Sequence, residues 1–109
     1  MLNTYTPDRW VILEIKTPTE CVYKILAGWR GGFASGDSWR LSSAIVDSDT
    51  WESGYAFVNE SGSKYVCFTE SEGMTMYMSE IYQQFEDSAA GKGKIRIVTA
   101  EEYLKMEIK

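Results

Sequence analysis

Two β-rich segments joined by a short turn constrain the fold more than any other feature of this sequence. Residues 9–16 (RWVILEIK) place apolar side chains on both faces of an extended chain, and residues 21–29 (CVYKILAGW) resume this pattern. A period of two residues is typical of β-strands. Between the segments, Pro18 presets the backbone for a turn. The sequence therefore predicts a first hairpin, with residues 9–16 as a central strand.

Three further strands are predicted in the middle of the chain and one near its end. Residues 39–46, 54–60 and 64–70 are rich in β-branched and aromatic side chains, and Ser61 to Ser63 predict a tight turn between the last two segments. We expect those two segments to pair as a hairpin. Residues 94–98 (KIRIV) predict a last short strand.

Two segments in the last third of the chain have helical character. Apolar side chains at helical spacing predict an amphipathic helix over residues 75–90; they are Met74, Met78, Ile81, Tyr82 and Phe85. Thr99 and Glu102 have the spacing of a capping box, which predicts a short helical turn through Lys105. We expect one α+β domain over residues 1–109. It would consist of a small antiparallel sheet of about five to six strands with one amphipathic helix packed on it and a short C-terminal helical turn.

The sequence contains no histidine. Histidine is the usual general base, a common metal ligand and the partner of serine and cysteine nucleophiles. We therefore expect no metal, no cofactor and no catalytic residue, and the sequence favours a non-enzymatic function.

Two short motifs resemble known ion sites but fail at the decisive positions. A calcium loop that began at Asp47 would need glycine where the chain has Glu52, so Asp47 to Asp49 is predicted to be a polar turn. The segment from Gly91 to Lys94 follows a helix and has no serine or threonine after the lysine, so it is not a phosphate-binding loop.

Acidic residues outnumber basic ones, and the net charge is −5 at pH 7. Residues 47–90 hold nine carboxylates and only Lys64, a net charge of −8. This balance disfavours binding to nucleic acid, whose phosphates repel an acidic surface. It leaves open either a solvated surface or an acidic face for a basic protein partner.

The N-terminal segment has neither the basic start nor the apolar core of a secretion signal, and no apolar run reaches the length of a membrane span. We expect a cytoplasmic protein with no membrane partner. In that reducing compartment, Cys21 and Cys67 are predicted to be two small buried side chains rather than a disulfide.

The loop from Gly28 to Arg40 is the strongest candidate for a binding site. Glycines allow backbone N–H groups to approach a ligand, indole rings offer stacking faces, and guanidinium groups suit phosphate or carboxylate. The predicted ligand-binding residues are Trp29, Arg30, Gly31, Gly32, Gly36, Asp37, Ser38, Trp39, Arg40 and Ser42. The alternative is a wide structural turn in which the two tryptophans close the end of the sheet.

The stretch GWRGGFASGDSWRLSS, with YTPDRWVILEI before it and SGSKYVCF and GMTMYMSEI after it, resembles a family of small proteins of tailed bacteriophages. The shared pattern covers nearly the whole chain and includes Pro7, Asp8, Trp10, Val11, Gly36 to Trp39 and Ser61 to Ser63. Arg30 and Arg40 stand where similar proteins favour an aromatic residue and a lysine. The resemblance implies an origin rather than a mechanism.

Small acidic phage proteins often act by binding, and this analogy shapes the functional hypothesis. We expect a phage accessory protein that counters host defence by binding a small anionic ligand, such as a nucleotide immune signal, as a homo-oligomer. Three alternatives stay open. They are an acidic module that inhibits a host protein, a histidine-independent enzyme that uses Asp37, and a minor virion component.

Overall fold

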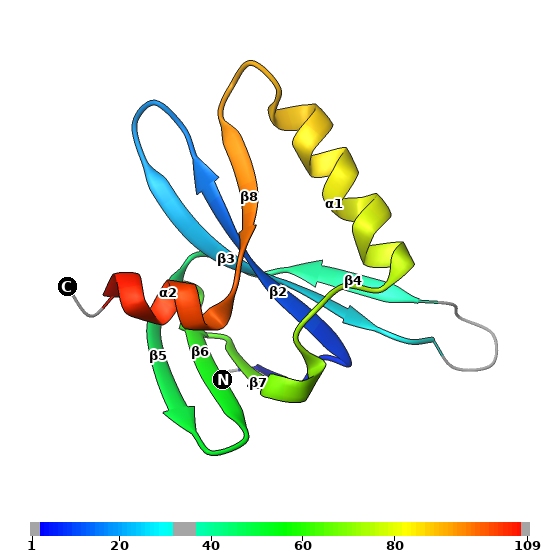
Figure 1. The fold of residues 1–109 in the computed structure, drawn as a ribbon, viewed down its shortest axis with the longest axis vertical. Helices are drawn as coiled ribbons and strands as arrows, with labels where there is room; N and C mark the ends of the chain where they lie inside the picture. Colours follow the sequence, from blue (N-terminus) through cyan, green and yellow to red (C-terminus); the bar gives the residue numbers. More distant parts are fainter. Residues whose placement is uncertain (1–2, 32–36, 108–109) are drawn as a thin grey trace.

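The structure is a computed structural model that describes residues 3–31 and 37–107. Within these residues the chain forms eight strands, two α-helices and one 3-10 turn (Figure 1). In chain order the elements are β1 (Thr4–Tyr5), β2 (Arg9–Lys16), β3 (Cys21–Trp29), β4 (Ser38–Leu41), β5 (Ile45–Trp51), β6 (Gly54–Asn59), β7 (Lys64–Phe68), η1 (Thr69–Ser71), α1 (Met76–Ala89), β8 (Lys94–Val98) and α2 (Ala100–Glu107).

The α+β class is confirmed, but the described strands form two sheets rather than one. Sheet B has the order β4-β3-β2-β8 and is antiparallel throughout. The predicted hairpin is present, with Lys16 opposite Cys21 and Arg9 opposite Gly28, and the predicted position of β2 inside the sheet is also confirmed.

Sheet A has the order β1-β7-β6-β5, and only its short β1–β7 pair is parallel among the described strands. The prediction of one strand over residues 39–46 is wrong because the chain passes from β4 in sheet B to β5 in sheet A within that range. The buried Ser42 anchors this crossing. Its Oγ accepts from the N–H of Ile25 at 2.8 Å and donates to the carbonyl of Ser43 at 2.7 Å.

The predicted polar turn at Asp47 to Asp49 is also wrong, because these residues lie in the edge strand β5. The carboxylate of Asp47 accepts from the N–H of Ser48 at 2.9 Å, and that of Asp49 accepts from the N–H of Thr50 at 3.0 Å. Local side-chain bonds of this kind give aspartate a place at an exposed sheet edge, which its low strand propensity would not predict.

Two apolar cores divide the molecule into layers. One face of sheet B packs on sheet A and α2 around Trp10, Phe57, Tyr65 and Tyr103, and the other face packs on α1 through Met78 and further apolar side chains. Figure 1 shows α1 and sheet A on different sides of sheet B.

Both helices start where the sequence predicts. The side chain of Thr75 accepts from the N–H of Met78 at 3.1 Å to cap α1, and that of Thr99 accepts from the N–H of Glu102 at 3.0 Å at the start of α2. No helix in the described ranges is long and apolar enough to cross a membrane.

The two cysteines are free, as predicted. Burial is confirmed for Cys67 and wrong for Cys21, which lies exposed at the start of β3, near the turn. Burial raises the pKa of the Cys67 thiol well above its usual range, so this thiol stays protonated within the core.

Candidate functional site

The register of β3 and β4 separates the two tryptophans of the predicted loop. Trp29 lies opposite Ser38 and Trp39 lies opposite Gly28, so the two indoles project from opposite faces of sheet B. Trp29 meets Tyr5 with ring centroids 6.1 Å apart, whereas Trp39 packs on Phe85 of α1 at 5.4 Å. The two indoles therefore do not share one binding surface.

Two other predicted ligand residues are engaged within the protein. The guanidinium of Arg40 lies 4.7 Å from the centroid of the Tyr5 ring, which is a cation–π contact. Ser42 is buried at the crossing between the sheets, and its hydroxyl makes the two hydrogen bonds described above.

Carboxylates accept hydrogen bonds from the backbone of Arg30 and Gly31, where the loop begins. Asp8 accepts from the backbone N–H of Arg30 at 2.8 Å, and Asp37 accepts from the backbone N–H of Gly31 at 3.2 Å. Asp37 thus has a role in the loop itself. The predicted residues Gly32 and Gly36 lie outside the described residues.

A cavity of about 480 Å³ lies beside this loop, and we call it the arginine cavity. It is lined by Asp8, Arg9, Arg30, Glu70 and Ser71. Among the described residues, neither guanidinium takes part in an ion pair. The cavity therefore combines two unpaired cations with two carboxylates.

Two lining residues of the arginine cavity, Glu70 and Ser71, belong to η1, whose flanking residues are bonded to Trp10. The fully buried indole donates from Nε1 to the carbonyl of Phe68 at 2.8 Å, and the carbonyl of Trp10 accepts from the N–H of Gly73 at 2.8 Å. Beyond η1, the carboxylate of Glu72 accepts from the N–H of Ala100 at 2.8 Å. Both ends of η1 are thereby tied to other elements.

The sequence prediction included Arg30 but missed the other four residues of the arginine cavity. The predicted hairpin contained a signal for two of them. A four-residue turn that pairs Lys16 with Cys21 brings Arg9 opposite Gly28, and therefore Asp8 next to Trp29. No local signal places Glu70 and Ser71 there, because the hydrogen bonds that anchor the segment around η1 come from Trp10 and Ala100, which are far away in the sequence.

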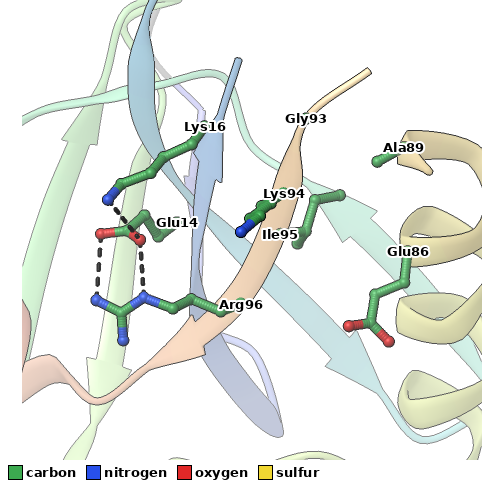
Figure 2. Close-up of a pocket in the computed structure, with 8 residues that line it drawn as sticks. All are labelled: Glu14, Lys16, Glu86, Ala89, Gly93, Lys94, Ile95 and Arg96. Carbon is green, nitrogen blue, oxygen red and sulfur yellow. Dashed lines mark hydrogen bonds and ion pairs between the residues drawn. The ribbon is translucent and has the colours of Figure 1, made fainter. Parts of the chain in front are cut away.

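A second cavity, of about 370 Å³, lies between β8 and the C-terminal part of α1, and we call it the β8 cavity (Figure 2). Its charged lining residues are Glu14, Lys16, Glu86, Lys94 and Arg96. Figure 2 shows Glu14 between the side chains of Lys16 and Arg96 on one side of β8, and Glu86 of α1 on the other side.

Glu14 is the organising group of the β8 cavity, and only 4% of it is exposed. Its carboxylate accepts from Arg96 Nε at 2.7 Å and from the Tyr23 hydroxyl at 2.7 Å, and Lys16 Nζ lies 3.9 Å away. Arg96 Nη1 donates to Glu102 at 3.1 Å. These bonds tie β2, β3, β8 and α2 together.

The protonation states in this network suit a structural role. The hydrogen bond from Arg96 lowers the pKa of Glu14, which opposes the effect of burial and keeps the carboxylate ionised. Burial, reinforced by the hydrogen bond to Glu14, raises the pKa of Tyr23 and keeps its hydroxyl protonated. Neither group is tuned toward neutral pH, as a general acid or base would be.

The carboxylates of residues 47–90 are divided between the outer layers of the molecule. Asp47 and Asp49 belong to β5 in sheet A, whereas Glu80, Glu86 and Asp87 belong to α1 on the other side of sheet B. In residues 3–31 and 37–107, no group of three or more acidic or cysteine side chains is placed to hold a metal ion. No family model, curated protein or solved structure matches the chain.

Proposed function

We propose that this protein binds a small anionic ligand in the arginine cavity. In accordance with the sequence resemblance, the proposal includes a phage accessory role in which the ligand is a nucleotide signal of host defence and binding removes it from its receptor.

One observation carries this proposal: Arg9 and Arg30 line one cavity, and neither guanidinium forms an ion pair among the described residues. Arginine binds phosphate through paired N–H donors, and such charge-assisted bonds are about twice as strong as neutral ones. The remaining lining groups refine the ligand class. Asp8 and Glu70 accept hydrogen bonds, so they suit a ligand that carries hydroxyl or amine donors beside its anionic group.

The binding test uses inorganic pyrophosphate as probe and isothermal titration calorimetry at low salt as readout. The double variant Arg9→Gln, Arg30→Gln is expected to bind at least about tenfold more weakly than the parent protein, since it loses two charge-assisted contacts. The matched variant Lys16→Gln, Lys94→Gln removes the same charge from the β8 cavity and is expected to bind as the parent does. Loss of binding in the lysine variant alone, or no binding by the parent protein, contradicts the proposal.

The proposed role in defence has its own test, by native mass spectrometry. The purified protein is incubated with lysate from phage-infected cells that carry an active defence system, and then denatured to release bound molecules. A released mass in the nucleotide range is expected from the parent protein and not from the double arginine variant. An unliganded mass in both samples contradicts the sequestration of a nucleotide.

A further inference from the structure

The outer face of sheet A carries an exposed pair of aromatic rings. Tyr55 of β6 contacts the buried Trp10 and so faces the core, which turns its neighbour Gly54 toward the outside. Gly54 pairs with Trp51 on one side and Phe68 on the other. These two side chains are 40% and 37% exposed, and their ring centroids are 6.1 Å apart in an edge-to-face arrangement.

Gly54 permits this arrangement. A Cβ at this position would lie 2.5 Å from the carbonyl oxygen of Cys67, so the neighbouring backbone leaves no room for a side chain. The two rings therefore meet over Gly54, which has no side chain to separate them. The backbone of Phe68 is fixed as well, because its carbonyl accepts the hydrogen bond from Trp10.

A cavity of about 440 Å³ adjoins Phe68 of this pair, and we call it the aromatic cavity. It is lined by Ser53, Phe68, Thr69 and Glu70. Glu70 also lines the arginine cavity, so the two cavities share this residue of η1. Thr69 is held at this junction by a 2.9 Å hydrogen bond from its N–H to the carbonyl of Ser53.

We infer that the two cavities form one site for a nucleoside diphosphate. Arg9 and Arg30 bind the phosphates, the ring of Phe68 stacks on the base, and the Glu70 carboxylate accepts from a ribose hydroxyl or a base amine between them. The inference rests on the proposed function and adds the base subsite to it. The rings of Trp29 and Trp39 are poorer candidates for this role because, unlike Phe68, neither lines the arginine cavity, the aromatic cavity or the β8 cavity.

The first experiment compares ADP and GDP with pyrophosphate and with adenosine on the parent protein by calorimetry. Stacking of one base on an aromatic ring is expected to make at least one of the two nucleotides bind about 5- to 150-fold more tightly than pyrophosphate. Adenosine is expected to bind much more weakly than ADP, since it lacks the phosphates. If pyrophosphate binds and both nucleotides bind no better, the base subsite is wrong and the proposed anion site stands. If no probe binds, both are wrong.

The second experiment locates the ring with two variants. Phe68→Leu keeps apolar volume but removes the flat ring, so it is expected to lose the advantage of the preferred nucleotide over pyrophosphate while pyrophosphate still binds as before. Trp39→Leu is a matched control, because Trp39 is 38% exposed but packs on Phe85 of α1, away from sheet A. This variant is expected to keep the nucleotide preference of the parent protein. Retained nucleotide preference in the Phe68 variant overturns the inference. Retained binding of pyrophosphate in the same titrations shows that each variant is folded.

Discussion

The arginine cavity and the β8 cavity both gather cations in an acidic protein, but they use them differently. In the β8 cavity, the three side-chain nitrogens of Arg96 donate to carboxylates of Glu14 and Glu102. In the arginine cavity, Arg9 and Arg30 have no ion-pair partner among the described residues. Arg96 is therefore paired within the fold, whereas the guanidinium groups of Arg9 and Arg30 remain available to a ligand.

This difference shows that a count of cations does not locate an anion site. By count, the β8 cavity is the more basic of the two, with Lys16, Lys94 and Arg96 in its lining. Its central carboxylate, Glu14, is nevertheless buried and ionised and already accepts hydrogen bonds from Arg96. An incoming anion would therefore be repelled by Glu14 and would compete with it for Arg96. The buried Glu14 carboxylate therefore distinguishes the structural cluster around Arg96 from the candidate ligand-binding cluster around Arg9 and Arg30.

The largest expected effect tests the structural role of the β8 cavity. Glu14→Ala removes the shared acceptor of Arg96 and Tyr23, and we expect a loss of about 3 kcal/mol in the free energy of unfolding. Urea denaturation measures it. The control Glu102→Ala removes a half-exposed partner of the same arginine and should cost less than about 1 kcal/mol. Equal losses in the two variants would remove the distinction between the cavities.

Gly93 tests how closely the wall of the β8 cavity is packed. A Cβ on Gly93 would collide with the carbonyl oxygen of Lys16, so Gly93→Ala is expected to cost about 2 kcal/mol. Gly91 is a suitable control. It has a φ of +83° and nothing within 4 Å of a built Cβ, so Gly91→Asn should cost less than about 1 kcal/mol. The contact explanation fails if thermal unfolding ranks the two variants the other way.

A pH titration isolates the ionic part of the Glu14 network. Because the pKa of Glu14 is lowered below its ordinary 4.5 in the folded state, its charge stabilises the fold fully above that pH. The contribution is lost as the pH falls through the folded pKa. The difference in unfolding free energy between the parent protein and Glu14→Gln should therefore be constant near neutral pH and shrink below pH 4.5. A difference that stays constant into strong acid would mean that Glu14 contributes only by shape.

The secondary structure was predictable where periodicity extends over a whole element. The bounds of β2, β3 and β8 agree with the sequence prediction, because each has an alternating or β-branched pattern over its full length. The crossing at Ser42 was not predictable. The segment between β4 and β5 is short and is flanked by apolar residues, so the sequence does not distinguish it from the middle of one longer strand. Only the structure shows that the chain changes sheet there, where Ser42 bonds to Ile25 and Ser43.

The candidate site was predictable in part, for a related reason. Glycine, tryptophan and arginine content pointed to the loop that contains Arg30, but composition does not reveal which face a side chain takes. Trp29 and Trp39 were grouped by their closeness in sequence and are separated by strand register. Glu70 joins the site through the packing of η1 on Trp10, which joins residues 58 positions apart.

The smallest expected effect is the sharpest test of the arginine cavity. The double variant Arg9→Gln, Arg30→Gln should unfold within about 0.5 kcal/mol of the parent protein, because it breaks no ion pair between described residues. Its urea midpoint and slope, measured without any ligand, provide this comparison. Added pyrophosphate should then raise the midpoint of the parent protein and leave that of the variant unchanged, since only a ligand that binds the native state stabilises it. A loss of more than about 1 kcal/mol without ligand would show that the two arginines stabilise the fold, as we infer for Arg96 from its bonds to Glu14 and Glu102. The contrast between the cavities would then disappear.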